Sequence, residues 1–374
     1  MRINNSSKLT AKGNRKMARN TAKQASDAMR IGIVGVGIGQ AHINGYKKTR
    51  NAEIVALCDL NTERAQKVAH DCGLENVEIY SDHRALLDSG GIDAVSVCLP
   101  NSFHAPVSID CLNAGKHVLC EKPLAMNARE GQKIADAAAK NNRKCMVAQV
   151  NRFRADSQYL KRRIAAGDLG DIYYAHTGWL RKRGIPGYGG WFTTKAMSGG
   201  GPLIDIGVHM LDIAWWLCGC PRPVAVSGAT YAEFGPRGRG LGNWGTEKKP
   251  EGTFDVEDLA AGLIRFDNGL TINLEVSWAL NNRKERQWCQ IFGNEGGCDW
   301  GQDTGIYRED GGSITTTTPE LPKVDPWQGE MQHFLDSITN DTTPDPDVTQ
   351  GVQMMKMLDG IYKSAQTRKE VVIK

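Results

Sequence analysis

The sequence lacks any apolar run near the roughly 20 residues that a membrane-spanning helix requires, and it lacks internal repeats. Charge of one sign is also scarce, because the formal net charge is only +4 over 374 residues. We therefore expect neither a membrane nor a nucleic acid as a partner. Hydrophobic residues make up 40% of the chain, which is enough for two domains with cores of their own.

Paired metal-ligand patterns are missing too, although the chain has 10 cysteines. The only close pair is Cys218-Gly-Cys220, and no second pair completes a zinc set. The other prominent cysteines end or lie inside apolar runs, as small buried hydrophobes do; they are Cys58, Cys98, Cys120 and Cys145. We expect no metal site, reduced thiols and a cytoplasmic protein.

Residues 1–29 are basic, with seven Lys or Arg side chains against the single acid Asp27, so the rest of the chain is close to neutral. This arm has no apolar segment of the kind that a secretory signal carries. A mis-assigned upstream start and an arm that wraps a partner subunit are open alternatives. The shortage of apolar residues favours disorder, and Met29 would be a sensible start of the fold.

Residues 30–150 alternate apolar strand-like runs with helical patterns, which predicts an α/β domain with a parallel sheet covered on both faces. The runs that predict strands are 30–36, 53–58, 92–98, 116–120 and 143–149. Helical patterns lie near 40–49, 62–71, 105–114 and 127–140.

Residues 151–374 predict a second, α+β domain with a large open sheet that is mostly antiparallel. Asp267-Asn-Gly269 is a hairpin signal between two of its strands. The expected strands are 171–181, 223–233, 256–267, 269–279 and 286–292, and helices are expected near 155–167, 327–339 and 347–365. The glycine- and charge-rich segment 235–254 is expected to be a mobile loop.

A glycine-rich turn follows the first predicted strand and precedes the first helix. Gly35, Gly37 and Gly39 permit a tight turn and close approach of the backbone to a dinucleotide pyrophosphate, which the helix N-terminus would attract. A strict G-x-G-x-x-G pattern would place its third glycine at Gln40, so Gly39 lies one residue early. A glycine turn that binds no ligand is the alternative for this motif alone.

Asp59 ends the next predicted strand. A carboxylate at that place accepts hydrogen bonds from the ribose of NAD and repels the 2′-phosphate of NADP. Arg64 follows closely, although a place on the helix surface is the simpler expectation for it. The predicted cofactor is NAD, with NADP possible.

Two further motifs carry candidate catalytic groups. In Cys120-Glu-Lys-Pro123, Lys122 lies at the carboxyl end of a parallel strand, the edge where such sheets bind ligands. In Gly199-Gly-Gly-Pro-Leu-Ile-Asp205, a helix is expected from Pro202, and its spacing places Asp205, His209 and Asp212 on one face. A solvated ion pair and a solvent-facing polar stripe are the respective alternatives.

Together these motifs resemble the glucose–fructose oxidoreductase / inositol dehydrogenase (Gfo/Idh/MocA) family over about residues 30–365. The resemblance implies a doubly wound Rossmann domain over 30–150 and an α+β substrate and oligomerisation domain over 151–374. It implies His209 as general base, Lys122 and Asp205 as catalytic partners, and Asn151 and Arg152 at the substrate and the domain junction. The implied cofactor contacts are Gly35, Gly37, Ile38, Gly39, Gln40, Asp59, Pro100, Asn101, His104, Glu121 and Lys122.

The expected activity is hydride transfer between NAD and a secondary hydroxyl of a sugar, cyclitol or sugar derivative. Trp179, Arg181 and Trp191 are candidates to line the substrate pocket, and a homodimer or homotetramer is implied by resemblance. Two alternatives stay open. One is an enzyme that cleaves glycosides through transient oxidation at C3; the other is a dinucleotide-binding regulator without catalysis.

Overall fold

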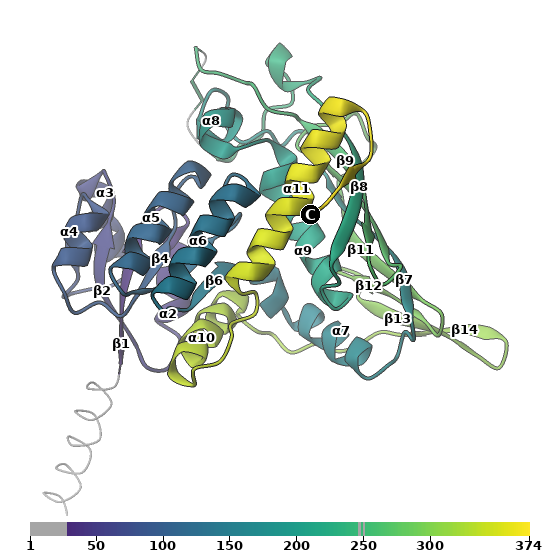
Figure 1. The fold of residues 1–374 in the computed structure, drawn as a ribbon, viewed down its shortest axis with the longest axis horizontal. Coiled ribbons are helices and arrows are strands. Elements are labelled where there is room, and N and C mark those ends of the chain that lie inside the picture. The colour runs from purple at the N-terminus through teal and green to yellow at the C-terminus, as the bar shows by residue number, and fades with distance from the viewer. Residues whose placement is uncertain (1–27, 246–247, 250) are drawn as a thin grey trace, which may run out of the picture.

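The structure is a computed structural model that describes residues 28–374 apart from 246, 247 and 250. The expected disorder of the basic arm, and part of the expected mobile loop, lie outside the described residues. Two sheets stand at opposite sides of the molecule, with helices on and between them (Figure 1). Each sheet is formed by the part of the chain whose pattern predicts it.

The first sheet is parallel and doubly wound, as expected. Its six strands lie in the order β3-β2-β1-β4-β5-β6, and every neighbouring pair is parallel. The strand order reverses between β1 and β4, the place where open α/β sheets bind their ligands. The strands are β1 (Met29–Val34), β2 (Ala52–Cys58), β3 (Glu78–Tyr80), β4 (Ala94–Val97), β5 (His117–Glu121) and β6 (Cys145–Ala148).

Three of the connecting helices, α3, α4 and α6, begin at a capping side chain. Asn61, Asp82 and Asn127 each accept a hydrogen bond from a backbone N–H of the following first turn. The sequence pattern misses β3 and the helix that follows it, because three and six residues are too short to show a period. The helices are α2 (Gly39–Tyr46), α3 (Thr62–Asp71), α4 (His83–Asp88), α5 (Asn101–Asn113) and α6 (Ala128–Lys140).

The second sheet has nine strands in the order β14-β13-β12-β11-β7-β10-β9-β8-β15. It is antiparallel except for the β7–β10 pair. The predicted turn at Gly269, whose φ is +88°, joins β9 to β10. The strands are β7 (Ile172–Leu180), β8 (Pro223–Tyr231), β9 (Leu259–Phe266), β10 (Thr271–Ser277), β11 (Arg286–Gly293), β12 (Gly297–Trp300), β13 (Gly305–Asp310), β14 (Ser313–Thr317) and β15 (Val371–Val372).

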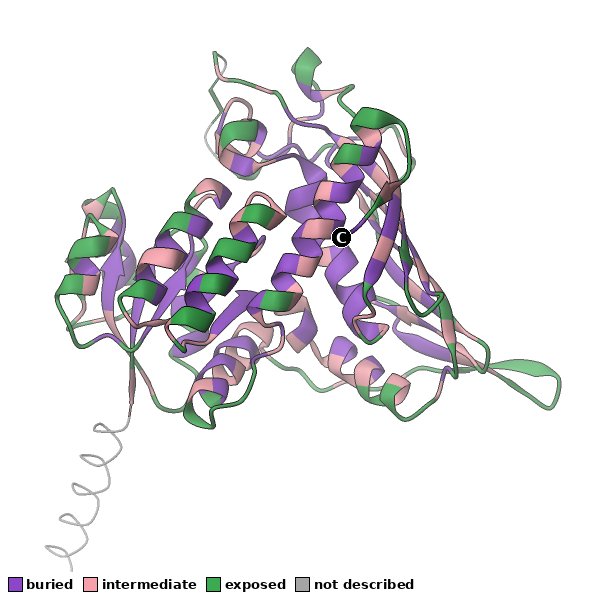
Figure 2. Cartoon of the chain, viewed as in Figure 1, coloured by how far each residue is buried: buried purple, intermediate pink, exposed green. Residues whose placement is uncertain are grey.

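Helices fill the space between the two sheets. Figure 2 shows α9 buried along nearly its whole length, and His209 is its one residue that is not buried. Helix α11 packs on both α6 and β8 and so joins the two sheets. These helices are α7 (Ala155–Ala165), α8 (Lys195–Ser198), α9 (Val208–Leu217), α10 (Pro326–Thr339) and α11 (Val348–Thr367), with single turns η1 (Val150–Phe153), η2 (Trp191–Thr193), η3 (Leu203–Gly207) and η4 (Gly235–Arg237).

Helix α10 packs on the first domain, although it lies in the part of the chain after residue 150 that was expected to form the second domain. Its Met331, Phe334 and Leu335 are buried in the same cluster as Ile33 and Ile43 of the first domain. The chain therefore returns to the first domain after β14, before it adds β15, the last strand of the second sheet. The sequence does not reveal this, because an amphipathic pattern shows that a helix has a buried face but not which core covers it.

Candidate active site

The glycine turn has the geometry of a dinucleotide cradle. Gly35 has a φ of +92°, and a Cβ there would lie 2.2 Å from the carbonyl oxygen of Cys98. A Cβ on Gly39 would lie 3.0 Å from Ile33, so this glycine lets α2 approach the sheet. A Cβ on Gly37 would meet no protein atom within 4 Å. These are the three glycine roles in a pyrophosphate-binding turn, and Gly39 fills the third despite its shifted position.

Asp59 organises the cradle from the end of β2. Its carboxylate accepts from the backbone N–H of Val36 at 3.1 Å and of Asn61 at 2.9 Å. Arg64 donates to both carboxylate oxygens, at 2.8 and 2.6 Å. The arginine is exposed as expected, but it is paired with the acid that faces the ribose position. Gln40 is exposed and makes only a long contact with the Val36 carbonyl, at 3.5 Å.

Lys122 directly follows β5 and lines a cleft that Ile38, Asp205 and His209 also line. The neighbouring Glu121 fixes the backbone there by accepting from the Lys122 N–H at 3.0 Å, and its other oxygen is 3.1 Å from Nε2 of His42 on α2. Burial alone would raise the pKa of Glu121, but the His42 hydrogen bond and the Lys122 charge lower it below the usual value. Glu121 is therefore a buried carboxylate that anchors the catalytic strand end to the cofactor helix.

Asp205 meets Lys122 across the cleft. The ammonium Nζ lies 3.1 Å from Oδ1 of Asp205 and 3.0 Å from its backbone oxygen. The indole Nε1 of Trp278 donates to Oδ2 at 2.9 Å from a fully buried position. Both carboxylate oxygens thus have a fixed partner. The sequence prediction missed Trp278, since a tryptophan in an apolar strand run looks like any core residue.

The triple glycine that precedes Asp205 allows a tight wall of polar contacts. A Cβ on Gly200 would lie 1.9 Å from the Tyr362 hydroxyl, and one on Gly201 would lie 2.0 Å from the Glu257 carbonyl. Glu257 is buried and accepts from the N–H groups of Gly201 and Leu203 and from Tyr362. The glycines therefore permit a close approach of Tyr362 and Glu257, and Glu257 holds the turn that carries Asp205.

The helix expected from Pro202 begins as a π turn, η3, before it continues as α9. A π turn closes i→i+5 hydrogen bonds and so shifts the faces of the residues after it. Asp205 and His209 both line the cleft, but Asp212 does not share their face. It turns instead to Arg152, which corrects the expectation of one polar stripe.

His209 is electrostatically suited to stay neutral. Burial lowers its pKa well below the usual value, and the nearby charges of Lys122 and Arg181 lower it further. Its Nδ1 is buried without a hydrogen-bond partner. A neutral imidazole is the form that can accept a proton.

The cleft that these groups share has a volume of about 320 Å³, which is within the usual range for small-molecule sites. Ile38 of the glycine turn and a set of aromatic side chains line it. Trp179, Arg181 and Trp191 line it, as the sequence predicts. The prediction missed three further aromatic side chains, namely Phe192, next to Trp191, and Trp244 and Trp327 from distant segments.

Two of the expected cofactor contacts near α5 do not line the cleft. His104 is fully buried, with its ring nitrogens 2.6 and 2.7 Å from the carbonyls of Pro123 and Leu99. It ties the loop of Lys122 to the loop before α5, and Pro100 is the residue before that helix. Asn101 does line the cleft and donates to the Ser198 carbonyl at 2.7 Å.

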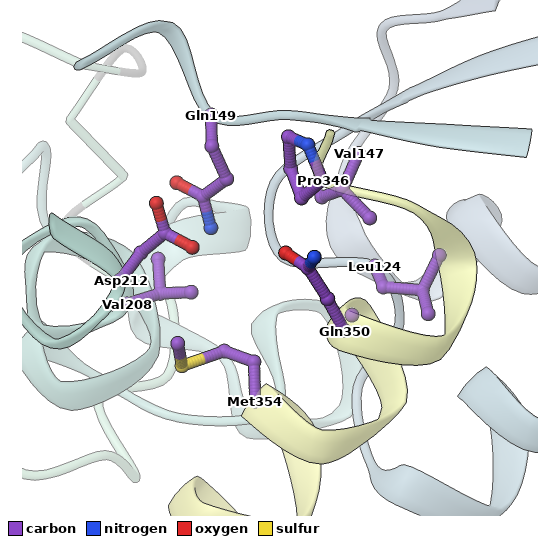
Figure 3. A pocket seen from close by; sticks show the side chains of 9 residues that line it. Leu124, Val147, Gln149, Val208, Asp212, Pro346, Gln350 and Met354 are labelled. Atoms are coloured by element: carbon purple, nitrogen blue, oxygen red, sulfur yellow. The ribbon is translucent and has the colours of Figure 1, made fainter. Parts of the chain in front are cut away.

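Asn151 and Arg152 do not reach the cleft either, which corrects their expected contact with substrate. Arg152 is 1% exposed and binds both oxygens of Asp212, at 2.9 and 2.7 Å, as well as Asp345 and Gln350. A buried guanidinium needs such partners, and they turn it toward the domain junction. Figure 3 shows the adjoining cavity, where Asp212 and Gln350 face a space of only about 10 Å³, room for one water at most.

The described residues form neither a metal-binding cluster nor a membrane-spanning helix. No group of three or more His, Cys, Asp or Glu side chains in residues 28–374, outside the gaps, is arranged to hold a metal ion. In the same residues no helix combines the length and hydropathy needed to cross a bilayer. All ten cysteines are described, and each is unpaired.

A cradle for a dinucleotide, opening into a cleft with a lysine, a carboxylate and a neutral histidine, defines a Rossmann-type nicotinamide oxidoreductase. Residues 29–149 match the model of the oxidoreductase family with an NAD-binding Rossmann fold, and residues 157–299 match the GFO/IDH/MocA C-terminal domain. The chain belongs to the Gfo/Idh/MocA family of NAD-binding dehydrogenases.

Its relatives include sugar dehydrogenases. The chain is 34% identical to D-glucoside 3-dehydrogenase of Escherichia coli K12, over 91% of this chain and 97% of the relative. It is 30% identical to levoglucosan dehydrogenase of Pseudarthrobacter phenanthrenivorans, over 72% of each. The solved structure of a levoglucosan dehydrogenase in complex with NADH superposes with a TM-score of 0.82 at 25% identity, covering 93% of this chain and 99% of that one.

Proposed function

We propose that this protein oxidises a secondary hydroxyl of a pyranose sugar, glycoside or cyclitol with NAD. The contact between Lys122 and Asp205 carries the proposal. The contact joins two motifs that are far apart in sequence. It lies in the cleft that is also lined by His209 and by Ile38 of the glycine turn. The relatives that act on D-glucosides and levoglucosan support the sugar class.

The side chains divide the chemistry between them. His209, held neutral by burial and by two cations, takes the proton of the substrate hydroxyl. Lys122 stabilises the oxygen as it gains negative charge. Asp205, fixed by Trp278, accepts a hydrogen bond from a hydroxyl and keeps the lysine in place. The glycine turn and Asp59 would hold NAD, which would supply the hydride acceptor for the substrate carbon.

The walls of the cleft suit a sugar ring. Indole rings of Trp179, Trp191, Trp244 and Trp327 present flat apolar surfaces, and the hydrogen-bearing face of a pyranose can stack on such a ring. The carboxylate of Asp205 and the imidazole of His209 line the same cleft and can meet the hydroxyls. This combination favours a polyol with one apolar face over an open-chain acid.

A substrate panel tests the proposal. Pyranoses, methyl glycosides and inositols are incubated with NAD, and formation of reduced nicotinamide is followed by absorbance. We expect turnover by the wild type, a loss of at least about 100-fold in kcat for H209A, and NAD binding unchanged. H70A, on the exposed outer surface of α3, is the matched control.

Three outcomes distinguish the alternatives. Tight NAD binding without oxidation of any substrate would favour a regulator. Release of an aglycone without accumulation of NADH would indicate glycoside cleavage through transient oxidation. Full turnover by H209A would remove the assignment of the base.

We further propose that the protein is a cytoplasmic homodimer or homotetramer. By strand alternation, Tyr174, Trp288 and Phe292 share the face of the large sheet away from α9 with the polar His176 and Gln290, and association with a second copy would cover the aromatic side chains there. Light scattering that finds a monomer would contradict this. We also propose two functional units, one of residues 30–150 with α10 for the cofactor, and one of the remaining part of 151–374 for substrate and assembly.

A further inference from the structure

Arg181 occupies the cleft directly beyond the end of β7. Its backbone N–H donates to the Ser277 carbonyl at 3.0 Å, so the chain is still held by the neighbouring strand. Trp179 lies two positions earlier and therefore on the same side of the strand. The guanidinium carbon lies 4.2 Å from the centroid of the Trp179 ring and 4.8 Å from that of Trp244.

The stem of this side chain is fixed as well. A Cβ on Gly184 would lie 2.7 Å from Cδ of Arg181, so the glycine is packed against the stem. The carbonyl of the same glycine accepts from Nε1 of Trp244 at 3.0 Å. Two indole rings and a backbone segment thus aim the guanidinium at the cleft, and a rigid fork of donors is suited to specific recognition.

Among the residues that the structure describes, the guanidinium has no carboxylate partner. Its Nη1 is buried without a hydrogen-bond partner, and in the part of the chain that the structure describes no carboxylate lies within ion-pair distance of it. Against the lowering effect of burial, the negative charges of Asp205 and Glu285 favour the charged form of Arg181 and so raise its pKa, but neither carboxylate is hydrogen-bonded to it. By contrast, Lys122 is paired with Asp205. An unpaired cation in such a place is costly, unless a ligand supplies the anion.

We propose that Arg181 binds a carboxylate of the substrate, so that sugar acids and their glycosides are the preferred class. The inference rests on the proposed dehydrogenase function and narrows its substrate. Arg181 and His209 line the same cleft of about 320 Å³, so one ring can offer a hydroxyl to the histidine and an acid group to the arginine.

A carboxylate fits this place better than a phosphate. Arg181 and Lys122 are the cations among the cleft residues, and Asp205 already neutralises the lysine. A single guanidinium matches the charge and the planar shape of a carboxylate through two parallel hydrogen bonds. A dianionic phosphate would keep a full charge without a partner.

Matched substrates test the inference. Methyl β-D-glucuronide, its uncharged uronamide, methyl β-D-glucoside and its 6-phosphate, with the galacto and manno counterparts, are compared by kcat/KM with NAD. Binding of each to the enzyme–NAD complex is also measured by calorimetry, which needs no turnover. R181Q and R181K are compared with R183Q, because Arg183 is exposed and bonds to the Leu280 carbonyl and Asn281.

We expect the wild type to prefer a uronate over its uronamide, and R181Q to lose roughly 10- to 150-fold more with the uronate, the worth of a charge-assisted hydrogen bond. R181K should retain part of the preference, and R183Q all of it. Equal use or equal binding of acid and amide by the wild type overturns the inference, even if R181Q fails to fold. A preference for the phosphate overturns the carboxylate class. If the enzyme oxidises only neutral glycosides, this inference is refuted and the dehydrogenase function stands. If it oxidises none of the substrates, the dehydrogenase function is refuted. In that case the calorimetric comparison of acid and amide still tests whether Arg181 binds a carboxylate.

Discussion

Substitution of Gly37 by alanine should separate cofactor binding from folding. The built Cβ meets no protein atom within 4 Å, and the φ of Gly37 is not in the left-handed region. Alanine at such a position restricts the unfolded chain and raises the free energy of unfolding by about 0.4–1 kcal/mol. We therefore expect the Tm of G37A to stay the same or to rise by ~1–3 °C.

NAD binding should respond in the opposite direction. The open space beside Gly37 is where a pyrophosphate approaches the backbone, so a methyl group there displaces it. Loss of one hydrogen bond to a charged group costs about 1.5–3 kcal/mol, which is roughly 10- to 150-fold in the Kd for NAD.

Two other glycines provide the controls. A Cβ on Gly305, in β13, would have no contact closer than 3.5 Å, so G305A should keep or slightly raise the Tm, as G37A does, but leave the Kd for NAD unchanged. At Gly35 the clash with the Cys98 carbonyl and the φ of +92° should prevent proper folding. Calorimetric titration of NAD and thermal unfolding give the result. A G37A protein that binds NAD as tightly as the wild type would refute the cradle.

Three further outcomes are expected. Because burial and neighbouring cations lower the pKa of His209, the neutral base persists as pH falls, and kcat/KM should decline only below about pH 6.5, the ordinary histidine pKa; a decline that begins above it contradicts the assignment. R152M leaves Asp212 as a buried unpaired charge and should lower the free energy of unfolding by about 3–5 kcal/mol in urea titrations, while a pure rise in KM would return Arg152 to the substrate site. D59N should lower kcat/KM for NAD relative to NADP, since the charge that opposes a 2′-phosphate is removed; an unchanged ratio would place the ribose elsewhere.

Local patterns predicted most of the fold. Strands β4 and β6 are buried throughout, and β1, β2 and β5 are buried toward their carboxyl ends, so each appears in the sequence as an apolar run. The hairpin at Gly269 followed from turn chemistry alone. Short elements such as β3 and the fully exposed β14 leave no such pattern.

The candidate site was predictable as far as it depends on compact motifs. Lys122, Asp205 and His209 meet because strand ends and glycine turns fix where they lie. Trp278 and Trp244 come from segments whose place is set only by tertiary packing, so their sequence neighbourhood shows nothing of it. Arg152 and His104 were expected to contact substrate and cofactor, but both are buried and bond to protein groups. A polar residue next to a motif can hold the protein core together as readily as it can bind a ligand, and the sequence does not distinguish the two.

The structure of the protein with NAD bound is the most direct test of a single redox centre built from the glycine turn, Lys122 and His209. We expect the nicotinamide ring in the cleft beside Ile38, with its reactive carbon on the side of His209. A pyrophosphate away from Gly37, or a ring outside the cleft that holds the Lys122–Asp205 pair, would contradict the account.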